Sequence, residues 1–246
     1  MYTDIDNLYK KFIDIRKMGF VPSLRDGPTG IGYTFETLLG KKEDKLISPD
    51  FGSIEIKTMS IISRRKLHLF NATPDGDYAQ PINRILNSLG YPDKQNPAFK
   101  SFHMDVNAKK YTWIGYYKKM RLYVNKYDKK VELFAYRENG NMIDLQTSWS
   151  FSLLEERLKT KLAYLAVVEA KKKYINGIQH YHYTKISFYK LRDFKRFIKL
   201  IKNGKIMVTF KISTIKTGER IGEIHDHGTD FSIYYKNINR LYKRIG

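Results

Sequence analysis

The sequence predicts a mixed α/β protein in two lobes. Stretches with helical spacing of apolar residues are interspersed with stretches of strand character along the whole chain. The 246 residues, of which 42% are hydrophobic and 28% charged, suffice for a full core in one large domain or two small ones. A change of character near residues 140–150 places the boundary there, giving lobes of 1–145 and 146–246.

The elements of the first half follow from residue periodicity and from turn residues. In the N-terminal segment, apolar side chains fall on one helical face, which predicts a helix over 4–18. A Gly- and Pro-rich loop over 19–32 is followed by a short helix over 33–41, which a glycine ends. Next come a strand over 45–60, broken by a proline and a glycine, and a second strand over 65–72. A hairpin is predicted over 117–138.

The second half continues with both kinds of element. A helix is predicted over 151–160, and a long hairpin over 163–191 turns at Asn176 and Gly177. Apolar residues at helical spacing predict another helix over 191–202. Two strands, over 205–214 and 230–235, flank a polar loop, and the end of the chain, 237–245, is predicted to be a helix.

Charge and cysteine content restrict the class of function. The chain has 45 Lys and Arg against 25 Asp and Glu, a net charge of +20, which attracts polyanions and favours a nucleic-acid partner. Without cysteine there is no disulfide, thiolate metal site or cysteine nucleophile. No apolar run reaches the length of a membrane span, about 18 residues. The N-terminal segment has no apolar secretory core, so we expect a cytoplasmic protein.

Residues 49–58, PDFGSIEIKT, are the most informative stretch for chemistry. Alternation on a strand sends Ile54 and Ile56 into the core and puts Glu55 and Lys57 together on the other face. Asp50 precedes a glycine-containing bend that can fold its carboxylate towards Glu55. Two converging carboxylates suit a hard divalent cation such as Mg²⁺, which polarises a phosphoryl oxygen and acidifies a bound water. Lys57 then supplies positive charge where negative charge develops.

Each part of this constellation also has an ordinary structural interpretation. A Glu-x-Lys pair on a strand is commonly a solvent-facing ion pair, and only the preceding Pro-Asp makes it more specific. Glu36 lies on the short helix before the strand, where it can bind a second cation or hold the lysine. It can equally be a surface residue of an amphipathic helix.

At these residues the sequence resembles a known family. The pattern G-x-G-x-T-x-E-x-L-L-G over 30–40, followed by P-D-x4-E-x-K-T over 49–58, is similar to that of the MvaI/BcnI restriction endonucleases. This family belongs to the PD-(D/E)xK nucleases and is similar to the MutH-type nicking enzymes of mismatch repair. The resemblance implies a nuclease core, with a mixed central sheet flanked by helices, and a second lobe that recognises DNA.

The resemblance also assigns roles to individual residues. It implies that Asp50 and Glu55 bind one or two Mg²⁺ ions, together with the backbone carbonyl of Ile56, that Lys57 is the catalytic lysine and that Glu36 is an additional acid. It further implies a monomer with one active site, which cuts a short duplex site of the CC-x-GG kind one strand at a time. A cognate DNA methyltransferase would be its genetic partner.

Candidate DNA contacts near the catalytic strand are basic side chains and the glycine-rich loop. Arg25, Arg64 and Arg65 can bind phosphates, although each taken singly can be an ordinary solvated charge. The loop over 27–32 can approach DNA closely through its backbone, with Thr29, Gly30 and the adjacent Tyr33 as contacts, or it can be a plain turn.

The best candidate for reading bases is the loop over 217–230, which is rich in donors and acceptors. Arginine can bind guanine with two hydrogen bonds, carboxylates can accept from cytosine, and histidine can do either. The residues that we expect to contact DNA are Arg220, His225, Asp226, His227 and Asp230. Two other interpretations stay open, since the two histidines can form a metal pair and the loop can be purely structural.

Three functions remain at this stage. The first is a Mg²⁺-dependent, sequence-specific type II restriction endonuclease. The second is a strand-specific nicking endonuclease of mismatch repair with the same core. The third is a non-catalytic basic protein that binds nucleic acid. Loss of cleavage without loss of binding in variants of Asp50, Glu55 and Lys57 separates both enzymes from the third.

Overall fold

The computed structural model describes residues 2–41, 48–61, 66–76 and 80–246. These residues form two compact units, and each unit is built from separate segments of the chain. The first consists of Met1–Leu67, Leu158–Arg192 and Ile238–Gly246, and the second of His68–Arg157 and Asp193–Asn237. The boundary expected between residues 145 and 146 falls inside one strand, β9 (Met142–Ser150), all of which belongs to the second unit.

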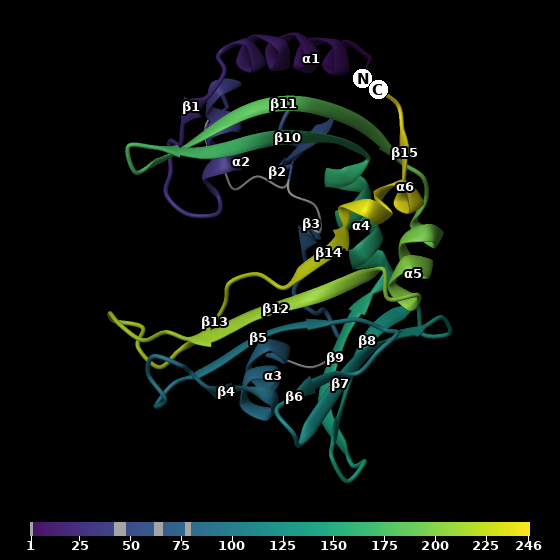
Figure 1. The fold of residues 1–246 in the computed structure, drawn as a ribbon. Coiled ribbons are helices and arrows are strands. Elements are labelled where there is room, and N and C mark those ends of the chain that lie inside the picture. Colours follow the sequence, from purple (N-terminus) through teal and green to yellow (C-terminus); the bar gives the residue numbers. More distant parts are fainter. Residues whose placement is uncertain (1, 42–47, 62–65, 77–79) are drawn as a thin grey trace. The chain divides into compact units, whose positions relative to one another are not determined.

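The first unit is a mixed sheet with helices on it (Figure 1). Its elements are α1 (Tyr2–Lys17), β1 (Val21–Pro22), α2 (Gly30–Leu38), β2 (Ile54–Ser60), β10 (Tyr164–Ile175), β11 (Ile178–Leu191), α6 (Ile238–Leu241) and β15 (Tyr242–Arg244). The strand order is β1-β11-β10-β2, with β15 also paired to β11. Among the described strands of this sheet, only β2 and β10 run parallel, and they pair in register with Ile56 opposite Ala166. No other described strand pairs with β2, so its second edge faces the bend before it.

One face of this sheet carries the hydrophobic core of the first unit. Leu8 and Phe12 of α1 are buried on it, as the helical spacing predicts, and so are Ile54 and Ile56 of β2. The helix α2 is held by an aromatic contact, with the ring centroids of Phe35 and Tyr183 4.9 Å apart. The hydroxyl of Tyr183 also donates to the carbonyl of Ile31, at 2.8 Å. These contacts fix α2 beside β2.

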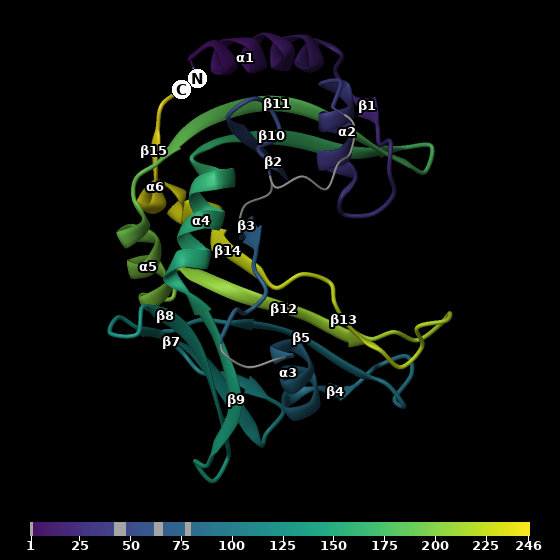
Figure 2. The ribbon, with the colours of Figure 1, turned by 180° about the vertical axis from the view of Figure 1, so that it is seen from behind.

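The second unit contains two further sheets. Its elements are α3 (Pro81–Leu89), β4 (Tyr91–Pro92), β5 (Lys100–Val106), β6 (Thr112–Ile114), β7 (Lys118–Asn125), β8 (Lys130–Arg137), β9, α5 (Phe194–Lys202), β12 (Ile206–Thr214), β13 (Ile224–Asp226), β14 (Asp230–Tyr234) and a 3-10 turn (Tyr235–Asn237). Two elements cross the boundary between the units, β3 (Lys66–Asn71) and α4 (Phe151–Leu162). One sheet has the order β3-β14-β12-β5-β4, with β13 on β12, and the other is the meander β6-β7-β8-β9. Figure 2 shows α3 beside β5 and β9.

The predicted mixed α/β class is confirmed, and so are most of its elements. The helices predicted over 4–18, 151–160 and 191–202 correspond to α1, α4 and α5, and both predicted hairpins form. The short helix starts earlier than predicted, at Gly30. Within the strand predicted over 45–60, only Ile54–Ser60 is extended, and residues 42–47 lie outside the described ranges.

The prediction of a helix over 237–245 is wrong for most of that segment. The chain makes one turn of helix in α6 and then continues as β15, which pairs with the edge of β11. Tyr242 is fully buried there. The unpaired backbone groups of β11 gain hydrogen bonds from this pairing, which a final helix would leave unmade.

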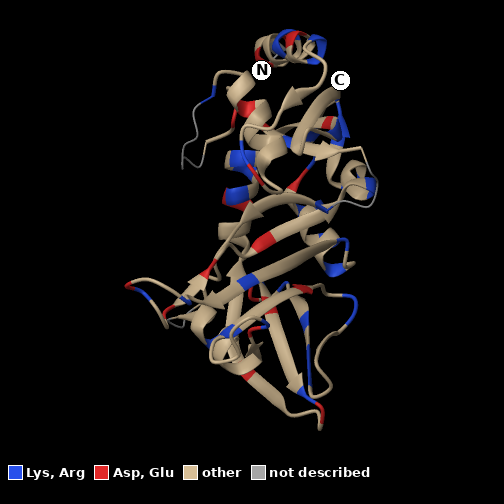
Figure 3. Ribbon diagram, turned by 60° about the vertical axis from the view of Figure 1, so that its left-hand side comes forward, with Lys and Arg blue, Asp and Glu red and all other residues tan. Residues whose placement is uncertain are grey.

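Basic residues are distributed over the helices and strands of each unit (Figure 3). This distribution spreads the net charge of +20 along the chain rather than confining it to one tail. Among the described residues, no helix is both long and apolar enough to cross a membrane.

Candidate active site

A tight turn before β2 positions the first carboxylate. Phe51 and Ile54 exchange two backbone hydrogen bonds of 2.9 Å, and Gly52 between them has φ +55°, in the left-handed region. A Cβ on Gly52 would lie 2.8 Å from Cγ of Asp4. The Ser53 hydroxyl donates to the same carboxylate at 2.8 Å. The left-handed conformation therefore favours glycine at this position, and the turn is fastened to α1.

The turn brings the Asp50 carboxylate back to β2. Its Oδ2 accepts a hydrogen bond from the Ile56 N–H at 3.0 Å, and its Oδ1 accepts one from Lys41 Nζ at 2.5 Å. Burial alone would raise the pKa of Asp50. The two hydrogen bonds and the charges of Lys41 and Lys57 outweigh burial and hold the pKa below its usual value. Asp50 is therefore ionised at neutral pH.

Glu55 and Lys57 share one face of β2, as strand alternation predicts. Lys57 Nζ lies 2.6 Å from Glu55 Oε1, and Lys161 Nζ lies 3.5 Å from the same oxygen. Glu55 is only 1% exposed, and its second oxygen, Oε2, is buried without a hydrogen-bond partner among the described residues. Burial raises the pKa of Glu55, the charge of Asp50 acts in the same direction, and the charge of Lys57 opposes both. An unpartnered buried carboxylate oxygen is costly unless a cation can reach it.

A backbone oxygen faces the same unpaired edge of β2. The N–H and C=O of one residue point to the same side of a strand. The N–H of Ile56 points away from β10, because it donates to Asp50. The Ile56 carbonyl therefore also projects from the free edge, on the side of Asp50.

Glu36 adds a third acid near this group. Burial raises the pKa of Glu36, and the charges of Asp50 and Glu55 add to this effect. The charges of Lys41 and Lys57 oppose it without cancelling it. Its position on α2 follows from the aromatic contact that holds this helix on the sheet. We call Glu36, Asp50, Glu55 and Lys57 the acid–lysine cluster.

The donors of this cluster fit Mg²⁺. In the parts of the chain that the structure describes, no three His, Cys, Asp or Glu side chains gather closely enough to hold a metal alone. Mg²⁺ usually takes only one or two protein carboxylates and fills its other positions with water and substrate phosphate. Asp50, Glu55 and the Ile56 carbonyl offer that kind of set, since all are hard oxygen donors and one oxygen of Glu55 has no other partner within the described ranges.

Sequence reasoning missed three residues near the cluster. Lys41 binds Asp50, and Lys161 lies against Glu55. The buried hydroxyl of Tyr242 has no hydrogen-bond partner in the described part of the chain. Burial raises the pKa of Tyr242, and the charge of Glu55 adds to this effect. Lys41 directly follows the glycine that ends α2, which was an available signal. The other two come from distant segments, and no local pattern points to them.

The residues predicted to bind DNA near the catalytic strand lie around the start of α2. The guanidinium of Arg25 lies over the Tyr33 ring, 3.8 Å from its centroid. Thr29 precedes α2 and makes no side-chain capping bond, and Gly30 is buried. Arg64 and Arg65 lie outside the described residues.

The residues predicted to read bases lie in the second unit, where several form bonds within their own loop. Both the Nε and a terminal nitrogen of Arg220 lie 2.7 Å from Glu223. Asp226 accepts from the Gly228 N–H and the Thr229 hydroxyl, both at 2.9 Å.

The two histidines and Asp230 complete this loop. The rings of His225 and His227 are 4.5 Å apart, and no metal-binding group includes them among the described residues. Asp230 is buried and bound by His68 and Lys211. Burial alone would raise the pKa of Asp230, but these two partners hold it below its usual value.

The chain is similar to known proteins in sequence and in fold. The model of the MvaI/BcnI restriction endonuclease family matches residues 9–242. A solved complex of the restriction endonuclease MvaI with its cognate DNA substrate is 29% identical, with a TM-score of 0.90 over 100% of this chain and 98% of that chain. MvaI in the absence of DNA has the same identity and coverage, with a TM-score of 0.65. No curated protein matches the sequence.

Proposed function

Because this chain belongs to the MvaI/BcnI restriction endonuclease family and is a type II site-specific deoxyribonuclease, we propose that it hydrolyses double-stranded DNA with Mg²⁺ at the acid–lysine cluster. The observation that carries this proposal is that the Asp50 carboxylate is folded back onto the Ile56 N–H, at 3.0 Å, close enough to Glu55 for their charges to interact, with Lys57 at 2.6 Å from Glu55.

The residues of the cluster have separate tasks in this proposal. Asp50, Glu55 and the Ile56 carbonyl hold the cation. Bound there, Mg²⁺ would supply Lewis-acid polarisation of the scissile phosphate and a more acidic water. Lys57 places its ammonium on the same face as Glu55, where it stabilises the charge that develops on the phosphate and orients the attacking water. Glu36 assists from α2, by holding Lys57 or by helping to bind a second cation.

Separate groups of residues hold and read the duplex in this proposal. The solved structure of MvaI with cognate DNA supports double-stranded DNA as the partner. Arg25, Thr29, Gly30 and Tyr33, with Arg64 and Arg65, contact the backbone near the cleavage site. The first unit then carries the catalytic function and the second unit the recognition of bases.

Base recognition falls to the loop of the second unit. Its members are Arg220, His225, Asp226, His227 and Asp230, and their mixture of donors and acceptors suits a site of the CC-x-GG kind. One acid–lysine cluster per chain favours a monomer that cuts one strand and then the other. A cytoplasmic location and a cognate methyltransferase complete the proposal.

Digestion of unmethylated plasmid DNA with Mg²⁺, followed by sequencing of the ends, tests this function. The expected result is double-strand breaks at one short G·C-rich site, with a nicked intermediate at early times. Single nicks that require another protein would instead support a strand-specific repair enzyme. No cleavage with any divalent cation would overturn the proposal.

A pair of lysine variants tests the assignment of the catalytic lysine. Lys57 and Lys161 both approach the same oxygen of Glu55, at 2.6 and 3.5 Å, so each substitution removes one positive charge from that carboxylate. Lys57→Ala should abolish cleavage and leave DNA binding intact, whereas Lys161→Ala should retain cleavage. Equal losses in both variants would contradict a specific role for Lys57.

A further inference from the structure

The meander β6-β7-β8-β9 of the second unit has one face that its own core does not cover. On β7, Met120, Leu122 and Val124 are buried. The alternate residues of this strand therefore point to the opposite face. The residues that share this face, or lie at its edge, are Tyr111, Trp113, Lys119, Arg121, Tyr123, Phe134 and Tyr136. We call this set the aromatic–basic face.

Large rings remain accessible on this face. Trp113 is 52% exposed and Tyr123 is 47% exposed, although side chains of this size are usually well buried. The turns at both ends of β7 add further exposed rings, Tyr116, Tyr117 and Tyr127. An accumulation of exposed aromatic residues on one surface of a soluble protein commonly marks an interaction site.

Cations are interleaved with these rings. Lys119 Nζ lies 4.9 Å from the centroid of Tyr111 and 5.4 Å from that of Trp113, and the Arg121 guanidinium lies 4.9 Å from Tyr111. Glu132, opposite Tyr123 on β8, is paired with Lys130 at 3.2 Å. The charges that contact the rings, those of Lys119 and Arg121, are therefore positive, which complements phosphate. The exposed carboxylate of Asp144 lies on β9, at the hollow described next.

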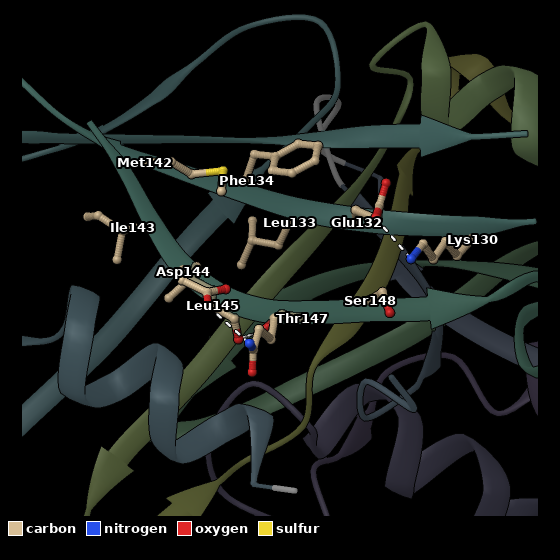
Figure 4. Close-up of a pocket in the computed structure, with 11 residues that line it drawn as sticks. Lys130, Glu132, Leu133, Phe134, Met142, Ile143, Asp144, Leu145, Thr147 and Ser148 are labelled. Atoms are coloured by element: carbon tan, nitrogen blue, oxygen red, sulfur yellow. Dashed lines mark hydrogen bonds and ion pairs between the residues drawn. The ribbon is translucent and has the colours of Figure 1, made fainter. Parts of the chain in front are cut away.

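A shallow hollow extends the surface along β8 and β9. The pairing of these strands shifts register between Leu133 and Ala135, and a cavity of about 210 Å³ opens there. Phe134 and Met142 lie together at one end of it, as Figure 4 shows. The lining of the hollow is mixed, since Glu132, Asp144 and Gln146 also border it. Its apolar end, at Phe134 and Met142, can receive a flat aromatic group.

We propose that the aromatic–basic face binds single-stranded nucleic acid, by stacking unpaired bases on Trp113 and Tyr123 and by pairing phosphates with Lys119 and Arg121. Exposed rings interleaved with basic side chains are what sequence-tolerant single-strand binding requires. Bases within a duplex are already stacked on one another, so double-stranded DNA would use only the charges. The surface uses none of the residues proposed for cleavage.

The chain contains a specific reporter for this interaction. It has two tryptophans, and Trp149 is fully buried, so quenching of tryptophan emission by an added ligand reports on Trp113. We would titrate the full chain with an oligothymidylate in EDTA, which prevents cleavage, and follow both tryptophan emission and the anisotropy of a labelled oligonucleotide. The expected result is saturable quenching that weakens as salt rises.

Variants separate the contributions of rings and charges. Trp113→Ala should weaken single-strand binding about tenfold, the scale of one lost base stack. Lys119→Ala should reduce the slope of log affinity against log salt by about 0.7, the value for one phosphate contact to a single strand. Lys10→Ala, which removes an exposed lysine from α1, is the matched charge control and should change neither. Plasmid cleavage by these variants should stay at the wild-type rate.

Three outcomes would overturn the proposal. The first is the absence of quenching by the oligothymidylate at concentrations that saturate anisotropy, since binding would then occur elsewhere. The second is equal quenching by a blunt duplex of the same length, which would identify duplex DNA as the occupant. The third is quenching that depends on protein concentration alone, which would identify a second copy of the chain.

Discussion

Replacing Gly30 by alanine tests why a glycine stands at the start of α2. A Cβ at this position would lie 2.4 Å from the Arg25 carbonyl oxygen, 2.5 Å from Ser23 Oγ and 3.0 Å from the Tyr181 hydroxyl. The nearest of these atoms belongs to the backbone, so it cannot move aside cheaply. The matched control is Gly27→Ala in the same loop, where φ is +81° and nothing lies within 4 Å of the added Cβ.

The two substitutions differ in their physical cost. Gly27→Ala places an alanine in the left-handed region, which costs roughly 1–2 kcal/mol. Gly30→Ala forces an overlap into a packed site, and overpacking of this kind costs typically 1–3 kcal/mol, occasionally more. Because 2.4 Å is far inside contact distance, we expect about 3 kcal/mol for Gly30→Ala. A loss of 1 kcal/mol lowers the melting temperature by about 2–4 °C in a protein of this size, so the expected decrease is about 6–12 °C.

The melting temperature of each variant is measured by far-UV circular dichroism. The affinity of each variant for uncleaved substrate DNA is measured in parallel. The packing account predicts that Gly30→Ala is clearly the less stable variant. If the two variants have the same melting temperature while only Gly30→Ala loses DNA affinity, the close contact at Gly30 does not affect stability. The glycine would then be explained by approach of the loop to DNA.

Three further predictions follow from individual contacts. Phe35→Ala removes the ring that packs on Tyr183 and should destabilise the protein by about 3–5 kcal/mol in urea unfolding. Lys41→Ala removes a partner that holds the pKa of Asp50 down, so the acid limb of the pH–cleavage profile should move to higher pH; an unchanged limb would refute the coupling. The lowered pKa of Asp230 means that its contribution to stability is present above the unfolded-state pKa and is lost as pH falls through the folded-state value. Asp230→Asn should therefore be less stable at pH 7 by about 1–3 kcal/mol, with the difference from wild type shrinking in acid.

Local pattern was sufficient for the part of the site that lies on one strand. Alternation put Glu55 and Lys57 on one face, and the glycine after Asp50 indicated the bend that returns its carboxylate to β2. Both features depend on neighbours within about ten residues. The roles of these residues follow from the family resemblance and stay proposals until variants are assayed.

Contacts between residues far apart in the sequence could not be predicted from local residue patterns. Lys161 reaches Glu55 from α4, more than a hundred positions along the chain, and nothing near it marks that contact. The end of the chain becomes β15 because β11 offers an unpaired edge, which is a property of the fold and not of the segment. The two units are also each assembled from separate segments, which a single boundary cannot describe.

Some missed elements carried a usable signal. In α3, Ile82, Ile85, Leu86 and Leu89 recur at helical spacing and are buried, and Pro81 stands at the helix start, where proline is favoured. In β9, buried Leu145, Thr147 and Trp149 alternate with polar residues, but the register shift against β8 interrupts the pattern. The helix α3 could therefore have been predicted from the sequence. The strand β9 could not, because its register against β8 had to be known.

The most direct test of the catalytic site is single-turnover cleavage of the mapped DNA site by Glu55→Gln, measured beside its affinity for the same DNA without divalent cation. The substitution keeps the shape of the side chain and removes the charge that is proposed to hold Mg²⁺. The account predicts a rate lower by about 10²–10³-fold, the scale of losing one preorganised electrostatic group, with unchanged affinity. Cleavage at the wild-type rate would contradict it.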